Sequence, residues 1–240
     1  MSLWDVADYV RLRSGGDDAQ LDEFARRHAV RGKRVLELGC GPGRAAAALA
    51  SRHGALVTAL DPSPVMLAAA RDRVPDDVEL VEGRAESLPF DAERFDAVLA
   101  NFVVHLLDRP RAFAEARRVL VPGGIVVVKT RDPATVHEWW ASPLFPSAER
   151  IERHRFPSGL QLVDELQAAG FDRATVERID VPRELSRADA LELLRSGAYS
   201  TLRLIPADEL EDGIRRAPVA LEDPVRYTLS LLRAEARKPG

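Results

Sequence analysis

Residues 34–44, RVLELGCGPGR, constrain the fold of this chain more than any other stretch. Their first part, residues 35–38, is mostly apolar, which is typical of a buried parallel strand. Three glycines at alternate positions follow, and an Ala-rich run at 45–50 continues the segment as a helix. Glycine permits a tight turn and lets a ligand lie against bare backbone, where the first N–H groups of the helix are unpaired. The segment therefore predicts a strand, a glycine turn and a helix.

The spacing of the glycines restricts the kind of ligand. A dinucleotide fingerprint requires G-x-G-x-x-G, whereas Gly39, Gly41 and Gly43 are spaced G-x-G-x-G. A Walker A loop requires a Lys followed by Ser or Thr, and neither follows Gly43. The strand instead carries an acid, Glu37, just before the turn, which would repel a phosphate and suits a cation. An ordinary strand-to-helix turn without a ligand is the alternative interpretation.

The segment ELGCGPG resembles motif I of the class I S-adenosylmethionine (SAM)-dependent methyltransferases, whose ligand carries a sulfonium and an ammonium but no phosphate. The resemblance implies an α/β fold: a Rossmann-like, doubly wound, seven-stranded sheet, mostly parallel with an antiparallel last strand, plus a helical lid. It also implies SAM as the cofactor, S-adenosylhomocysteine as its product and a small-molecule methyl acceptor. The cofactor contacts that it implies in this segment are Glu37, Gly39, Cys40, Gly41 and Gly43.

A second predicted strand, residues 55–60, ends at Asp61, about twenty residues after the first glycine. A carboxylate there can accept hydrogen bonds from both hydroxyls of a ribose. Asp61 can also cap the helix that follows, or do both. Dinucleotide-binding folds use the same device, so Asp61 by itself indicates a nucleoside rather than SAM. The resemblance adds Pro62 and Met66 to the implied cofactor contacts.

A third predicted strand at 78–81 leads into EGRAESLPF, which resembles the third motif of the same family. The resemblance implies that Ala85 and Glu86 approach the adenine. An exposed loop with a solvated Glu is the alternative.

The fourth predicted strand, residues 95–101, is the one after which the methyl group should meet its acceptor. Ligands of open parallel sheets bind where the strand order reverses, and the ends of the first and fourth strands flank that point. Asn101 and Phe102 are therefore predicted cofactor contacts. His105 can take a proton from a hydroxyl or amine acceptor, which makes it a candidate general base. Alternatively, His105 and Asp108 brace the loop.

The rest of the chain predicts one domain over residues 1–240, in which strands and helices alternate. RVLVPGGIVVV, at 118–128, matches the stretch that follows the motifs in the family. The predicted parts of the domain are N-terminal helices within 1–30 (3–13 and 17–29), a SAM-binding core at 31–131, a helical lid at 182–220 and a closing strand at 225–235. The remaining predicted elements are helices at 109–120, 159–169, 187–195 and 207–217, and strands at 125–128 and 174–181.

Aromatic residues offer candidates for an acceptor site. Trp139 and Trp140 are adjacent, and neighbours in a loop or short helix cannot both face one core. We therefore expect one of them to be exposed to a pocket for an apolar or aromatic substrate. A packing role for at least one of them is the alternative. Trp4 and Tyr9 of the first predicted helix either pack against the domain or cover the ligand.

Composition excludes several classes of function. A net charge of −4 and a pI of about 5.8 argue against a nucleic-acid or anionic-membrane surface. No apolar run reaches the ~20 residues of a membrane helix, and the first residues do not resemble a signal peptide. The single cysteine excludes an internal disulfide, and no residue cluster indicates a metal site. We expect a cytoplasmic monomer or homodimer. The rival interpretations are a protein or RNA methyltransferase, a nucleotide-linked oxidoreductase and a non-catalytic SAM-binding regulator.

Overall fold

The computed structural model describes residues 18–240, and the predicted helix at 3–13, with Trp4 and Tyr9, lies outside them. The described chain divides into two compact units. The core unit contains the residues up to Thr130 together with Gly159–Glu177 and Leu232–Gly240. The second unit contains Arg131–Ser158 and Arg178–Leu231.

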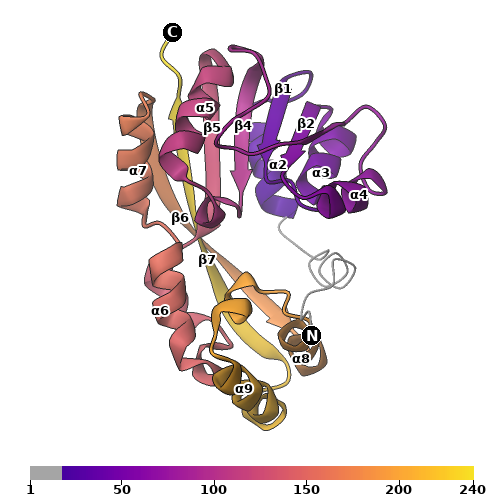
Figure 1. The fold of residues 1–240 in the computed structure, drawn as a ribbon, viewed down its shortest axis with the longest axis vertical. Coiled ribbons are helices and arrows are strands. Elements are labelled where there is room, and N and C mark those ends of the chain that lie inside the picture. The colour runs from indigo at the N-terminus through magenta and orange to yellow at the C-terminus, as the bar shows by residue number, and fades with distance from the viewer. Residues whose placement is uncertain (1–17) are drawn as a thin grey trace. The chain divides into compact units, whose positions relative to one another are not determined.

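Within residues 18–240 the strands form one seven-stranded sheet of order β3-β2-β1-β4-β5-β7-β6, with β7 antiparallel to its neighbours (Figure 1). This order reverses between β1 and β4 and confirms the predicted doubly wound α/β fold. The strands are β1 (Arg34–Leu38), β2 (Leu56–Asp61), β3 (Glu79–Glu82), β4 (Phe95–Asn101), β5 (Leu120–Arg131), β6 (Asp172–Leu185) and β7 (Val225–Arg237).

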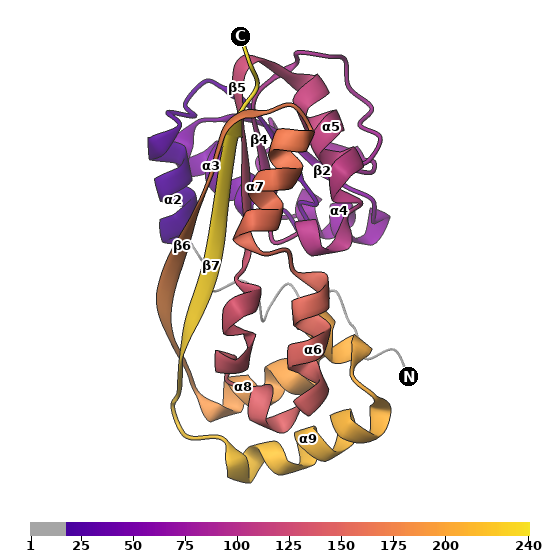
Figure 2. The ribbon, with the colours of Figure 1, turned by 90° about the vertical axis from the view of Figure 1, so that its left-hand side faces the viewer.

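Helices cover both faces of the sheet in the core unit (Figure 2). On one face α5 and α7 pack against each other and against the sheet, and on the other face α2, α3 and α4 contribute to the core. The helices of this unit are α2 (Asp18–Arg27), α3 (Arg44–His53), α4 (Pro64–Arg71), the 3-10 helix η1 (Val104–Leu106), α5 (Arg109–Val119) and α7 (Gly159–Ala168).

Strand alternation explains the two apolar cores. Leu36 and Leu38 of β1 lie in the core shared with α5 and α7, whereas Val35 lies in the core shared with α2 and α3. Successive side chains of a strand point to opposite faces, so a strand buried on both sides must be apolar at nearly every position. Glu37 departs from this rule, because it is 2% exposed and projects to the same face as Val35. A buried acid in such a strand indicates a functional role.

The structure corrects the predicted boundaries around β5. Residues 121–124 were expected to be a stop between a helix and a short strand, but they belong to β5. The pairing with β4 shifts between Phe95 and Ala97, and Gly123 has a φ of +76°, so an irregularity accommodates the glycines inside the strand. Both glycines hydrogen-bond to Lys238: the N–H of Gly123 donates to the carbonyl of Lys238 (3.0 Å), and the N–H of Lys238 donates to the carbonyl of Gly124 (2.9 Å). Strands β6 and β7 likewise extend beyond their predicted ends.

The second unit has a core of its own, made by helices that come from two separate stretches of the chain. The sequence predicted α8 and α9 but not α6, whose mostly polar residues showed no clear apolar period. The elements of this unit are η2 (Pro133–Glu138), η3 (Ser142–Leu144), α6 (Pro146–Arg155), α8 (Arg187–Arg195), η4 (Ser200–Leu204) and α9 (Ala207–Ala220).

The prediction that one of the adjacent tryptophans is exposed is wrong. Trp139 is 4% and Trp140 8% exposed. Trp139 directly follows η2, and rings of Phe145 and Tyr199 surround the pair, with centroids 5.2 Å (Trp139–Tyr199) and 6.2 Å (Trp140–Tyr199) apart. Because the chain turns at this point, helical spacing does not apply, and both indoles enter one core.

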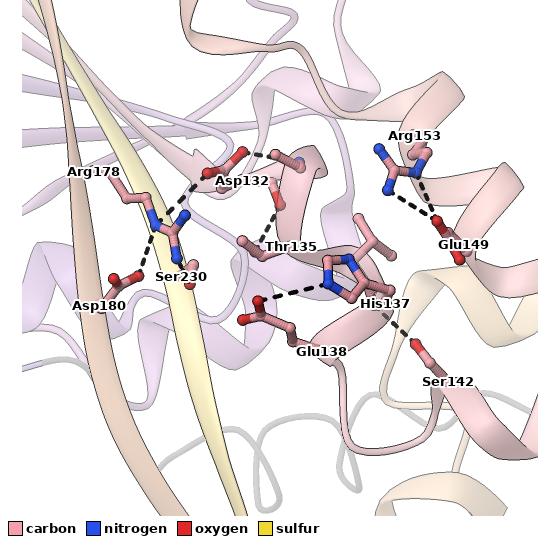
Figure 3. Close-up of polar contacts among 12 residues, drawn as sticks. Asp132, Thr135, His137, Glu138, Ser142, Glu149, Arg153, Arg178, Asp180 and Ser230 are labelled. Atoms are coloured by element: carbon pink, nitrogen blue, oxygen red, sulfur yellow. Dashed lines mark hydrogen bonds and ion pairs between the residues drawn. The ribbon is translucent and has the colours of Figure 1, made fainter.

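Asp132 fixes the start of the second unit (Figure 3). One oxygen of its carboxylate accepts a hydrogen bond from the N–H of Ala134 (2.9 Å), and its own N–H donates to the carbonyl of Ser230 (3.0 Å). Arg178 lies 3.9 Å from Asp132 and donates to the hydroxyl of Ser230 (3.2 Å) and to Asp180 (2.9 Å). Asp132 therefore starts η2 and ties it to β7.

Candidate functional site

The glycine turn lies between β1 and α3 and has one glycine that faces open space. Gly39, Gly41 and Gly43 all have positive φ angles, +64°, +53° and +76°. A Cβ on Gly39 would lie 2.3 Å from Cγ2 of Val103, and one on Gly43 would lie 2.8 Å from Val74. A Cβ on Gly41 would meet nothing within 4 Å. Packing thus requires two of the glycines, whereas Gly41 presents bare backbone to an open space that a ligand could occupy.

Asp61 lies at the end of β2 beside this turn. One carboxylate oxygen accepts from the N–H of Gly41 (2.8 Å) and the other from the N–H of Ser63 (3.0 Å). Ser63, and not Asp61, caps α4 by accepting from the N–H of Met66 (3.4 Å). Burial raises the pKa of Asp61, and the two backbone donors oppose that shift. Each oxygen retains acceptor capacity for a further donor, such as a ribose hydroxyl.

Glu37 and Asn101 project from adjacent strands to the same face of the sheet. Glu37 pairs in register with Leu99, and Asn101 lies two residues farther along β4, so alternation places both side chains on one side. Within residues 18–240, Oε2 of Glu37 and Oδ1 of Asn101 are buried without a hydrogen-bond partner. Native structures rarely leave such atoms unpaired, so these two acceptors indicate a missing donor.

The charge of Glu37 depends on its surroundings. Burial raises the pKa of the Glu37 carboxyl to about 8, while the Arg44 charge, the N–H of Ala46 and the Lys129 charge oppose the shift. The Asp61 carboxylate raises the pKa further. A cation bound beside Glu37 would favour its ionised form. The site is therefore suited to a cationic donor, as the sequence predicted from the acid before the turn.

The predicted adenine residues lie between β3 and β4. Ala85 is buried, at 4% exposure. The Glu86 carboxylate accepts from the N–H of Asp108 (3.1 Å) and lies 3.5 Å from Arg84, so it is not simply solvated. Its visible role is to hold the segment that leads into α5.

His105 lies on η1, and two residues separate η1 from the end of β4. The preceding Phe102 has a φ of +55°, and its N–H donates to the carbonyl of Lys129 (2.8 Å). Asp108 is the N-cap of α5 and accepts from the N–H of Arg111 (3.4 Å). The local fold thus places His105 on a short turn whose two ends are held by hydrogen bonds. The sequence predicted that His105 is either a general base or a residue that braces the loop.

The other predicted contacts surround the same turn. Burial raises the pKa of the Cys40 thiol, which disfavours a thiolate, and the Cys40 N–H donates to the carbonyl of Leu60 (3.0 Å). Pro62 is exposed and Met66 half-buried. Among the described residues, no group of three His, Cys, Asp or Glu side chains could hold a metal, and no helix is long and apolar enough to span a membrane.

Sequence reasoning missed Lys129 as a site residue. It is 4% exposed at the end of β5, next to Asn101 in register, and its ammonium lies 5.3 Å from the centroid of the Phe102 ring. A signal was present, since a lysine ends an otherwise apolar run in the sequence.

Comparison with known proteins finds methyltransferases. A family model described as a methyltransferase domain matches residues 36–128. The malonyl-[acyl-carrier protein] O-methyltransferase of Herminiimonas arsenicoxydans is 38% identical over 144 residues, which are 58% of this chain and 52% of that protein. The demethylmenaquinone methyltransferase of Chlorobaculum tepidum is 42% identical over 96 residues, 40% of this chain and 39% of that protein.

A solved structure shares the fold over nearly the whole chain. Phosphoethanolamine N-methyltransferase 2 of Haemonchus contortus, in complex with S-adenosyl-L-methionine, matches with a TM-score of 0.65 and 22% identity. The match covers 98% of this chain and 57% of that one. The chain spans about half the length, or less, of the two curated relatives above.

Proposed function

The chain carries a methyltransferase domain of the class I, SAM-dependent family, and on this basis we propose that it transfers a methyl group from SAM to a small organic acceptor. The observation that carries the proposal is the pair of unpartnered acceptor oxygens, Glu37 Oε2 and Asn101 Oδ1, on the adjacent strands β1 and β4. An ammonium supplies the donors that these atoms lack, and no phosphate or neutral apolar ligand would.

Other residues around the turn contact the remaining parts of the cofactor. Asp61 accepts from the ribose hydroxyls with the acceptor capacity that its two backbone donors leave. The backbone of Gly41 and Cys40 lies against the nucleoside, with Met66 and Pro62 at its edge. The backbone of Ala85 faces the adenine, while Glu86 holds the adjacent loop.

SAM, when bound, supplies a methyl group on a sulfonium that is already activated toward displacement. The protein must then align the acceptor behind the methyl group and exclude water, and orientation of this kind is worth effective molarities of ~10⁵–10⁸ M. His105 takes the proton of an acceptor that must lose one, such as an alcohol or a phenol. A carboxylate acceptor needs no base, and His105 would then only shape the loop.

A small organic acceptor is favoured over RNA by the net charge of −4, because an RNA-binding surface requires clustered positive charge. The names of the two relatives specify a malonyl group on a carrier protein and a demethylmenaquinone, so the family does not fix one acceptor. We place the protein in the cytoplasm as a monomer or homodimer.

The test is a transfer assay with methyl-labelled SAM and a size-fractionated extract of the source cells. Asp61→Asn, which keeps a neutral acceptor at the turn, serves as the binding-deficient control. Label in the low-mass fraction supports the proposal and provides the compound to identify. Label in protein or RNA would assign a macromolecular acceptor instead. SAM binding without transfer to any fraction would contradict an enzymatic role and favour a SAM-binding regulator.

A further inference from the structure

A pocket of about 390 Å³ lies in the core unit, at the edge of the sheet where the parallel strands begin. Its wall includes Lys33, which directly precedes β1, Asp96 near the start of β4, and residues 121–125 near the start of β5. The residues that we assign to SAM lie at or near the carboxyl ends of β1, β2 and β4. The pocket is therefore separate from the cofactor site.

The antiparallel direction of β7 brings the last residues of the chain to this same edge (Figure 1). Arg237 lines the pocket and donates to the carbonyl of Gly123 (3.1 Å). Gly123 has a φ of +76°, and a Cβ there would meet nothing within 4 Å. The irregularity in β5 thus holds the Arg237 guanidinium beside open backbone.

Positive charge exceeds negative charge on the wall of the pocket. Arg27, Lys33 and Arg237 contribute cations, and Asp96 contributes the one carboxylate among the described residues that line it. Arg34 donates to both oxygens of Asp96 (3.1 Å each). The Arg34 guanidinium and, to a smaller extent, the Lys33 charge hold the pKa of Asp96 below its ordinary value. Because Arg34 neutralises this carboxylate, the wall stays positive in a protein whose net charge is −4.

Two of the three cations retain donors for a ligand. Lys33 donates to the carbonyl of His28 (2.8 Å), as Arg237 does to that of Gly123. An ammonium has three N–H donors and a guanidinium five, so each side chain keeps donors beyond these hydrogen bonds. Arg27, in contrast, is balanced by three carboxylates within 4 Å: Glu23 (3.7 Å), Glu177 (3.4 Å) and Glu235 (3.6 Å).

The size and lining of the pocket indicate the kind of anion. Its volume falls within the roughly 300–1,000 Å³ of small-molecule sites, more than a bare phosphate needs. Val121, Pro122 and Ile125 add apolar surface to the wall. A lysine offers a compact charge and an arginine a planar fork that matches phosphate oxygens. A phosphate monoester carries a charge of about −1.5 to −2 at pH 7, which balances two cations better than a single carboxylate does.

We propose that this pocket binds a small organic phosphate monoester. The phosphate lies between Lys33 and Arg237, and the organic part lies against Val121, Pro122 and Ile125. The site goes beyond the proposed function and does not depend on it, because it lies at the opposite edge of the sheet from the SAM residues. A ligand bound there takes no part in methyl transfer.

The experiment measures the binding of phenyl phosphate to the full chain by calorimetry. The ionic strength is kept constant and low, since salt screens exposed charges. Inorganic phosphate and benzoate serve as comparison ligands, because the first lacks the organic part and the second lacks the second charge. The wild type should bind phenyl phosphate at least about tenfold more tightly than benzoate, and also more tightly than inorganic phosphate. Saturation with S-adenosylhomocysteine should leave the affinity for phenyl phosphate unchanged.

Variants assign the cations. Lys33→Met and Arg237→Met should each weaken phenyl phosphate binding by at least about fivefold, because each removes a charge-assisted hydrogen bond. Lys33→Arg keeps the charge and should retain most of the affinity. Both side chains are exposed, so melting temperatures and SAM affinity should stay close to those of the wild type. Arg226→Met is the matched control, since it removes an exposed arginine that pairs with Glu184 (2.7 Å) outside the pocket.

Four results would overturn the proposal. The first is a wild type that does not bind phenyl phosphate, and the second is equal affinity in the wild type and in the Lys33→Met/Arg237→Met double variant. The third is competition between phenyl phosphate and S-adenosylhomocysteine, which would place the anion in the cofactor site. The fourth is benzoate or inorganic phosphate binding as tightly as phenyl phosphate, which would indicate general attraction of anions instead of a site for an organic phosphate.

Discussion

The Asp61 carboxylate accepts a hydrogen bond from the backbone N–H of Gly41 over 2.8 Å, which links the end of β2 to the glycine turn after β1. A second hydrogen bond, from the N–H of Ser63 (3.0 Å), links the same carboxylate to the start of α4. The side chain that we assign to the ribose therefore also shapes the turn on which the nucleoside lies.

Asp61→Ala should weaken SAM binding and reduce stability together. The change removes acceptors from two backbone donors, and hydrogen bonds to a charged group contribute about 1.5–3 kcal/mol each. We expect a loss of SAM affinity of at least about tenfold in calorimetry and a lower melting temperature. Asp61→Asn keeps one neutral acceptor, so it should lose affinity with a smaller change in melting temperature. Wild-type affinity in Asp61→Asn would contradict the ribose assignment.

SAM affinity should depend on pH through Glu37. The pKa of Glu37 is about 8 in the ligand-free protein, so the carboxyl is protonated below that pH and must ionise to pair with an ammonium. Affinity should therefore rise by up to about tenfold per pH unit from pH 6 to 8 and level off above 8. Calorimetry in buffers of different ionisation enthalpy should detect proton release below pH 8.

Glu37→Gln is the control for this dependence. It should remove the contribution of the carboxyl and leave only the titration of SAM itself. A pH profile that is the same in the wild type and in Glu37→Gln would show that Glu37 does not face the ammonium.

Two glycines of the turn should respond differently to alanine. In Gly39→Ala the new Cβ would lie 2.3 Å from Val103 in a left-handed conformation, so the free energy of unfolding should fall by about 2–4 kcal/mol. In Gly41→Ala the Cβ meets no protein atom within 4 Å, so the cost should be about 1–2 kcal/mol from the backbone alone. SAM affinity should nevertheless fall strongly in Gly41→Ala. Denaturant unfolding and calorimetry distinguish the two effects, and full SAM affinity in Gly41→Ala would place the ligand elsewhere.

His105→Ala and His105→Gln should separate the two roles considered for this residue. If His105 is the base, both variants lose turnover on a hydroxyl or amine acceptor by about 10²–10⁴-fold while SAM affinity stays the same. A lower melting temperature with normal turnover would assign His105 to the loop structure instead. The measurements are initial rates on the identified acceptor and thermal unfolding without ligand.

Glu152 should stabilise the second unit. It is 2% exposed, accepts from the Thr201 hydroxyl (2.5 Å) and pairs with Arg131 (2.5 Å). Glu152→Ala leaves Arg131 without this partner in a largely buried position, which should cost about 3–5 kcal/mol. Glu149→Ala on the same helix breaks an exposed pair with Arg153 (2.9 Å) and should cost about 0.5 kcal/mol or less (Figure 3). Equal melting temperatures for the two variants would contradict the structural role of Glu152.

The alternation of strands and helices through β5 and the position of the glycine turn could be predicted from the order of residues alone. These features are local, because strand and helix periods and glycine spacing appear directly in the order of residues. The sequence also indicated ligand-binding roles for the acid in β1 and for the acid that ends β2. The match of residues 36–128 to a methyltransferase domain covers the same segment in which the sequence was most informative.

Which side chains share a face of the sheet depends on the fold. Lys129 and Glu37 are far apart in the sequence, and the register of β1, β4 and β5 brings them to one face of the sheet. The unpartnered oxygens of Glu37 and Asn101 became visible only once every neighbouring donor had a position. The burial of both Trp139 and Trp140 depends on helices from two separate stretches of chain, whose packing no local pattern encodes. Contacts between distant residues are set by the packing of the whole core. For this reason the full set of side chains in the candidate site could be identified only from the structure.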